Sequence, residues 1–204
     1  MFFSSCLCLF TLLTFLPLVI AKPRLLKLNV YYEPQNEEST QFFKEQMLPL
    51  YELGLLEKVN LKLIPFGRAE VDASTQEYNS KCQNGDEECE LMHLMSCALH
   101  DYRNHANSLD LIGCIQGQPS FDQAYTQCVQ KLPSRDAKWL AKCPHEFRGR
   151  YLSWVNGLRT KALGFKLPMV PTVVLDDKLN LEAPFNLKAQ ICSHLINEPK
   201  CQEL

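Results

Sequence analysis

The sequence lacks an excess of charge of either sign. Its 21 lysine and arginine residues nearly balance its 23 aspartate and glutamate residues, so the formal net charge is −2 at pH 7. A protein that holds nucleic acid through its phosphates usually carries a basic patch or stripe, and this chain has neither. It also has no acidic tail, no internal repeat and no low-complexity segment. We therefore expect a folded domain that does not bind nucleic acid.

Charged side chains are missing from residues 1–21, which read MFFSSCLCLFTLLTFLPLVIA. A long apolar run that ends in small or aliphatic residues is typical of a secretory signal peptide, and we expect cleavage after Ala21. No Lys or Arg precedes the apolar run, so the alternative is an uncleaved signal anchor, for which the length barely suffices. No second run is long enough to span a bilayer. We expect one domain over 22–204, with no stable membrane span.

Asn-x-Ser/Thr sequons are also missing after residue 21. The two nearest matches, Asn79-Ser80-Lys81 and Asn107-Ser108-Leu109, both fail at the third position. A mannose-phosphate route to lysosomes needs an N-glycan, so this route looks closed. We expect a secreted protein or one that resides in the endolysosomal lumen.

Cysteine, in contrast, is abundant. Of ten cysteines, Cys6 and Cys8 fall in the expected signal peptide. An even set in an exported chain predicts a disulfide framework, although eight cysteines allow 105 full pairings. The closeness of the last two in sequence favours pairing them, and the other six are left unassigned. The eight are Cys82, Cys89, Cys97, Cys114, Cys128, Cys143, Cys192 and Cys201.

Hydrophobic periodicity predicts a β-α-β unit at the start of the domain. Residues 25–33 and 58–67 alternate as strands do, and residues 39–53 show helical spacing with a kink expected at Pro49. Such a crossover predicts parallel strands.

The remainder predicts a helical insertion and a return to strands. Residues from about 70 to 165 indicate helices and loops, 169–177 and 178–184 a strand hairpin, and 185–196 a terminal helix. The order β-α-β, helices, β-β-α predicts an α/β, thioredoxin-like fold with a large cysteine-rich helical insertion.

The stretch CQNGDEECELMHLMSC, 82–97, resembles the signature of the gamma-interferon-inducible lysosomal thiol reductase (GILT) family. That signature runs Cys-Gln-His-Gly, two residues, Glu-Cys, two residues, Asn, four residues, Cys. Asn84 stands where the family has His, and Met92 where it has Asn. The positions that fit are Cys82, Gln83, Gly85, Glu88, Cys89 and Cys97.

The resemblance extends over the whole domain. VYYE at 30–33 is similar to the family's opening strand, and the spacing of the later cysteines is similar too. MVPTVVLDD looks like the segment whose proline is cis and faces the active site, which makes Pro171, after Val170, the expected cis residue.

The departure falls on the reductase site that the resemblance implies. The family places Cys-x-x-Cys, or Cys-x-x-Ser, two residues after YYE; here Asn36 takes the attacking position and Ser39 the resolving one. Attack on a disulfide needs a thiolate, and neither an amide nor an unactivated hydroxyl replaces it. The family nucleophile is therefore absent.

Two interpretations of the turn NEES remain open. Asn is a strong helix N-cap and Glu37 and Glu38 suit the first turn, so the segment can serve simply to hold the helix. The same carboxylates could form an acidic docking site for a ligand or partner. A substitute nucleophile such as Cys82 is a further possibility if one cysteine is free.

Zinc is a minor alternative for the helical face bearing Cys89, His93, Cys97 and His100. Four ligands spread over three turns of one helix do not all reach a tetrahedral ion, and disulfides are the simpler use of these sulfurs in an oxidising compartment. We predict no metal and no cofactor.

Three functions follow from the sequence. The leading hypothesis is a pseudoenzyme that binds polypeptide or a partner protein in a groove lined by Asn36, Ser39, Val170 and Pro171. The second is a thiol reductase of protein disulfides that uses a non-standard cysteine. The third is a lipid- or receptor-binding module in the helical insert, 82–143, which an exposed apolar face would support.

Overall fold

The computed structural model describes residues 24–202 except 75, 102–104 and 196. The expected signal peptide, 1–21, lies outside the described residues. Within them, no helix is both long enough and apolar enough to cross a bilayer.

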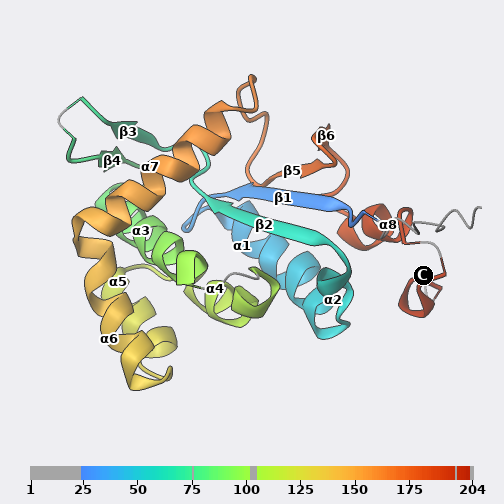
Figure 1. Cartoon of the computed structure of the whole chain (residues 1–204), viewed down its shortest axis with the longest axis horizontal. Coiled ribbons are helices and arrows are strands. Elements are labelled where there is room, and N and C mark those ends of the chain that lie inside the picture. Colours follow the sequence, from blue (N-terminus) through green and yellow to red (C-terminus); the bar gives the residue numbers. More distant parts are fainter. Residues whose placement is uncertain (1–23, 75, 102–104, 196, 203–204) are drawn as a thin grey trace, which may run out of the picture.

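A four-stranded sheet in the order β2-β1-β5-β6 forms the centre (Figure 1). β1 pairs with β2 in parallel and with β5 in antiparallel orientation, and β5 pairs with β6 in antiparallel orientation. The parallel pair and the closing hairpin confirm the thioredoxin-like order expected from the sequence. The strands are β1 (Lys27–Tyr32), β2 (Asn60–Pro65), β5 (Thr172–Leu175) and β6 (Lys178–Asn180).

The crossover between β1 and β2 is a helix interrupted by a π-helical turn. It runs as α1 (Glu37–Phe42), η1 (Phe43–Met47) and α2 (Leu48–Glu52). Pro49 lies just after the π turn. Because proline has no N–H to donate and its ring crowds the preceding turn, the helix widens there instead of continuing regularly. A kink was expected at Pro49, and the structure has a π-helical turn just before it.

Between β2 and β5 the chain is mostly helical, with one exception. Residues 70–81 contain a two-stranded hairpin, β3 (Glu70–Asp72) and β4 (Asn79–Lys81), where only helices and loops were expected. Its strands carry mostly polar residues, so they lack the apolar alternation that marks a half-buried strand. The helices are α3 (Asp86–Asp101), α4 (Leu109–Ile115), α5 (Phe121–Ala124), α6 (Ser134–Lys142) and α7 (Phe147–Lys161), and α8 (Leu187–Cys192) follows the sheet.

Four disulfides use all eight cysteines of the domain. Cys82 pairs with Cys89, Cys97 with Cys143, Cys114 with Cys128 and Cys192 with Cys201. Cys97–Cys143 joins α3 to the short helix η5 (Cys143–His145), and Cys114–Cys128 joins α4 to the helical turn after α5. Three of the four therefore lie within the helical insertion.

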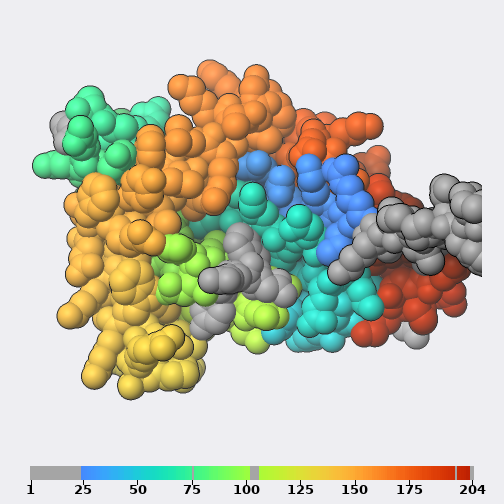
Figure 2. Space-filling view, viewed as in Figure 1, coloured from blue at the N-terminus to red at the C-terminus, as the bar shows by residue number. Residues whose placement is uncertain are grey.

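The sheet has an apolar cluster on each face. Leu28, Val30 and Leu63 point to the side covered by α1 and α2, where the larger cluster also takes in much of α3 and α4. Tyr31 and Ile64 point to the other side, where a smaller cluster includes side chains from α3 and packs against the segment after α7. In the space-filling view α7 and the β3–β4 hairpin lie side by side at one end of the molecule, away from α8 (Figure 2).

Gly149 sets how closely α7 approaches η5. A Cβ at this position would lie 2.5 Å from the carbonyl oxygen of Cys143 and 2.8 Å from Cα of Pro144. We predict that Gly149→Ala lowers the free energy of unfolding by about 2 kcal/mol, because the overpacking of backbone atoms outweighs the gain in helix propensity.

Gly113→Ala in α4 is the matched control for this unfolding experiment in urea. There the nearest atoms to the added Cβ belong to the flexible side chain of Leu48, at 3.1 Å, and we expect little change. Equal stability of the two variants would contradict the packing argument.

His93 makes folding depend on pH. It is buried in α3, and its Nε2 lies 3.0 Å from Oγ of Ser80. Burial, with the nearby charges of Arg150 and His145, lowers the pKa of His93 from 6.5 to about 4. As the pH falls below 6.5, His93 becomes protonated in the unfolded chain, whereas in the folded chain it becomes protonated only near pH 4. We predict that the free energy of unfolding falls over this range by up to roughly 3 kcal/mol.

Unfolding midpoints at several pH values between 7 and 4 would measure this effect. His93→Gln should flatten the dependence, because glutamine can hydrogen-bond to Ser80 without titrating. His194→Gln is the control, since that histidine is exposed. If His93→Gln and the wild type lose stability in parallel, His93 is not the responsible group.

Candidate functional site

The turn between β1 and α1 carries the two positions where the resemblance expects sulfur. Asn36 is the N-cap of α1, and its Oδ1 accepts a hydrogen bond of 2.7 Å from the backbone N–H of Ser39. Its Nδ2 donates to Glu38 at 2.8 Å. Ser39 is fully buried, and its Oγ accepts from the N–H of Glu33 at 3.4 Å. Both side chains are thus engaged in holding the turn.

Polar groups from the helical insertion hold the same turn from outside. Nε2 of Gln116, which follows α4, donates to the carbonyl oxygens of Glu33 and Pro34, both at 2.9 Å, and to Oγ1 of Thr40 at 3.1 Å. The N–H of Gly117 donates to the carbonyl oxygen of Pro34 at 2.8 Å. These bonds join the turn to a segment of the helical insertion, and Gln116 lies 83 residues after Glu33 in the sequence.

Glu88, in the signature segment, also holds the turn, and its bonds together with those of Gln116 are called the clamp below. Its side chain in the first turn of α3 is buried, and its carboxylate accepts from the N–H of Gln35 at 3.2 Å. The same carboxylate accepts from the N–H and Nδ2 of Asn84, at 2.9 and 3.0 Å. Asn84, one of the two departures from the family signature, therefore hydrogen-bonds to the carboxylate of Glu88, which in turn binds the β1–α1 turn.

Glu33 forms the most buried ion pair of the site. Glu33 is 2 % exposed, and its carboxylate accepts from the backbone N–H of Arg68 at 2.8 Å, from Nε at 3.1 Å and from Nη2 at 3.2 Å. The hydrogen bond to Glu33 raises the pKa of the Arg68 guanidinium. A buried carboxylate needs such partners, so β1 and the loop after β2 are tied together at this point.

The Val170–Pro171 peptide bond is cis. Thr172 stands opposite Tyr31 in the β1–β5 register, so Pro171 lies at the level where β1 leads into the turn. Val170 and Pro171 are both buried, and Asn36 is half-buried. The structure therefore brings the four expected groove residues to one end of the sheet but exposes little of their side chains.

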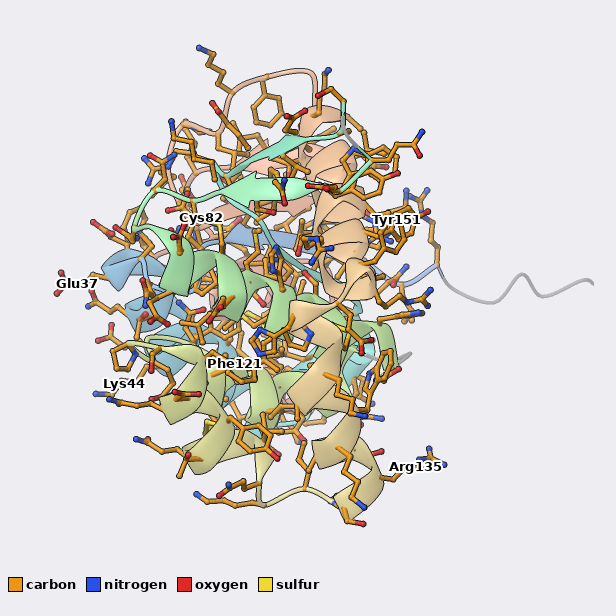
Figure 3. All side chains as sticks on the ribbon, turned by 90° about the vertical axis from the view of Figure 1, so that its left-hand side faces the viewer. Glu37, Lys44, Cys82, Phe121, Arg135 and Tyr151 are labelled. Atoms are coloured by element: carbon orange, nitrogen blue, oxygen red, sulfur yellow. A yellow bond between two sulfur atoms is a disulfide. The ribbon has the colours of Figure 1, made fainter. Side chains whose placement is uncertain are left out.

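The Cys82–Cys89 disulfide adjoins the residues that hold this turn. Cys89 directly follows Glu88, and Cys82 is partly exposed. Figure 3 shows Cys82 and Glu37 on the same side of the molecule, while Tyr151 of α7 lies on the other side. Acidic residues lie near the turn: Glu37 and Glu38 in the first turn of α1, and Asp86 and Glu87 in the first turn of α3.

The four α3 residues considered as zinc ligands make other interactions. Cys89 and Cys97 are in separate disulfides, Nε2 of His93 faces Ser80, and Nε2 of His100 contacts Arg148. Among the residues the structure describes, no group of three potential ligands gathers around one point.

Sequence reasoning missed a cavity of about 930 Å³ between the segment that follows β2 and the second half of α7. Phe66, Val71, Trp154 and Leu158 line it. No motif marks it in the sequence, because its walls come from segments some 85 residues apart that only the fold brings together. The polar clamp at Gln116 was missed for the same reason.

A family model described as gamma interferon inducible lysosomal thiol reductase (GILT) matches residues 27–132. The chain is 32 % identical to the gamma-interferon-responsive lysosomal thiol protein of Arabidopsis thaliana, over 94 % of this chain and 79 % of the relative. It is 29 % identical to a GILT-like protein of Caenorhabditis elegans over 82 % of this chain, but it spans only about half, 52 %, of that relative.

Solved structures agree on the fold. Chlamydia trachomatis DsbA aligns with a TM-score of 0.59 over 88 % of this chain and 87 % of its own, at 15 % identity. The reduced form of the disulfide bond oxidoreductase DsbG from Mycobacterium tuberculosis aligns with a TM-score of 0.55 over 87 % and 82 %, at 12 % identity. At such identities the likeness establishes a thioredoxin-like fold with inserted helices and nothing further.

The family model covers more than half of the 204 residues, and the plant relative is similar over most of both chains. With the signature segment on α3 and the thioredoxin-like sheet in place, the protein belongs to the GILT family.

Proposed function

We propose that this GILT-family protein lacks thiol reductase activity of its own and binds polypeptide at the β1–α1 turn in the lumen of the secretory pathway. The observation that carries the proposal is the pair of residues Asn36 and Ser39 at the positions of the family's reactive sulfurs. Asn36 serves there as a helix cap, and the hydroxyl of Ser39 is buried and already hydrogen-bonded.

The state of the other cysteines supports the absence of reductase activity. All eight cysteines within the described residues are in disulfides, so the structure offers no thiolate to attack a substrate. The four disulfides also fit an oxidising compartment and agree with export by the signal peptide expected at 1–21. Secretion or endolysosomal residence is part of this proposal.

Polypeptide binding is the function that the remaining site supports. The backbone around Val170 and Pro171 lies beside the turn, and thioredoxin-like folds offer such a segment to extended chains through main-chain hydrogen bonds. Because the side chains of Ser39, Val170 and Pro171 are buried, contacts would be made by backbone atoms and by Asn36. Such binding would be weakly selective for sequence.

A second candidate is an active reductase that uses the Cys82–Cys89 pair. Cys82 is partly exposed, and the pair lies beside the turn through Glu88 and Gln35. Against it, Glu88 and the acidic first turn of α3 place negative charge beside either sulfur, which disfavours a thiolate there. We rank it below the binding role.

We predict that the purified wild-type domain does not reduce insulin disulfides with a dithiol as electron donor, at pH 4.5 or pH 7. Asn36→Cys/Ser39→Cys should reduce insulin at least ten times faster than the dithiol does alone, because the hydrogen bonds of Gln116 and Glu88 already hold the turn in place. Turnover by the wild type that disappears in Cys82→Ala/Cys89→Ala would instead establish the second candidate.

Single substitution with cysteine tests binding separately from turnover. In Asn36→Cys the new thiolate attacks the disulfide of an unfolded, oxidised peptide; a mixed disulfide forms, and the peptide's other sulfur leaves as a thiolate. We predict that this trapping is at least fivefold faster than in Asn186→Cys, which places a thiol at the exposed N-cap of α8, at the other end of the sheet (Figure 1).

The two rates are compared after correction for the thiol pKa of each variant, measured by alkylation. Equal corrected rates would mean that the turn offers no peptide-binding surface, even if the double variant turns over a small disulfide. Faster trapping at position 36 supports the groove.

A further inference from the structure

The cavity beside α7 adjoins the turn at Arg68 and has the character of a ligand site. Its volume of about 930 Å³ falls within the range of small-molecule pockets, roughly 300–1,000 Å³. One wall is the segment from Phe66 to Ala73, which leads from β2 through β3. The other is the second half of α7 with the loop 164–167. Figure 1 shows α7 running past the hairpin on its way to the sheet.

The walls of this cavity are largely apolar. Phe66 is buried, and Val71 and Leu167 pack against the smaller core cluster. Gly157 lets the ring of Phe66 lie against α7, since a Cβ there would come within 2.7 Å of it. At the mouth, Leu158 is 46 % and Phe165 is 41 % exposed, although both are large apolar side chains. Apolar surface left open around a concave site marks a place where a ligand is bound.

The lining of the cavity carries more positive than negative side chains. Arg68 is occupied by Glu33, and Glu70, the one carboxylate in the lining, stands opposite Lys81 in the β3–β4 register. Lys161 and Lys166 are exposed and, among the described residues, have no carboxylate within ion-pair distance. The unbalanced charge at the rim is therefore positive.

We propose that this cavity binds a single-chain amphiphile with an anionic head group, of the long-chain fatty-acid class. The apolar walls would take the hydrocarbon chain, and Lys161 and Lys166 would face the carboxylate at the rim. Burial of the chain supplies most of the affinity and the lysines supply the preference for an anion. This inference does not rest on the proposed polypeptide-binding function.

Tryptophan fluorescence tests the proposal directly. The chain has two tryptophans: Trp154 lines the cavity, and Trp139 lies on α6. In a Trp139→Phe background, the emission reports on Trp154 and therefore on the cavity alone. Titration with monomeric oleate should give a saturable change with a Kd below about 10 μM, and oleyl alcohol should bind at least tenfold more weakly.

Variants locate the site. Lys161→Glu/Lys166→Glu should weaken oleate at least tenfold while leaving oleyl alcohol unchanged. Lys44→Glu/Lys178→Glu changes the net charge equally at exposed positions away from the cavity and should have no effect on either ligand. Leu158→Glu, at a position that is 46 % exposed, should weaken both ligands.

Several results would overturn the proposal. These are the absence of saturation by oleate up to 100 μM, equal losses in the two lysine pairs, or unchanged binding in Leu158→Glu. Binding to anionic phosphatidylserine vesicles without binding of monomeric oleate would also overturn it, because the surface would then recognise a membrane and not a single amphiphile. Circular dichroism of each variant checks that it is folded.

Discussion

The clamp on the β1–α1 turn is the constraint on which the rest of the structure depends. Two buried carboxylates, Glu33 and Glu88, and the amide of Gln116 meet there, each from a different segment. A buried carboxylate that loses its partners costs several kcal/mol, so these bonds form together or the turn does not pack. The helical insertion is thereby tied to the sheet at the turn that carries Asn36 and Ser39.

This clamp and the helix cap hold the turn with Asn36 and Ser39 at these two positions. Asn36 caps α1, and a good N-cap contributes about 1 kcal/mol relative to a residue that does not cap. Glu37 and Glu38 add favourable charge in the first turn of the helix, whereas the same charges would raise the pKa of a thiol placed beside them. The cap and these two carboxylates therefore favour the stability of the helix over the formation of a thiolate.

The sequence predicted what depends on local pattern. The strands alternate, Pro49 disturbs its helix, Asn36 caps α1, and Cys192 pairs with the neighbouring Cys201. The family followed from one spaced signature. What the sequence could not reveal depends on contacts between distant segments: the bonds from Gln116 to the turn, the pairing of Cys97 with Cys143, and the cavity.

The β3–β4 hairpin was missed for a different reason. Its exposed strands have no apolar face, and Tyr78 just before β4 adopts a positive φ of 56°, which is uncommon outside glycine and asparagine. The rings of Tyr151 and Trp154 on α7 hold Tyr78 there, at centroid distances of 5.6 and 4.9 Å. Tertiary packing against an aromatic face, and not strand propensity, places this hairpin beside the cavity.

Arg68 lines the cavity and also binds Glu33 beside the turn, and its bonds to Glu33 make it unavailable to a ligand in the cavity. The guanidinium lines the cavity, yet it holds Glu33 through both Nε and Nη2. An anion that drew Arg68 into the cavity would leave a carboxylate only 2 % exposed with a single backbone partner. That cost exceeds what one partly exposed ion pair returns. An anionic ligand is thus left to Lys161 and Lys166, and filling the cavity leaves the turn and its cap undisturbed.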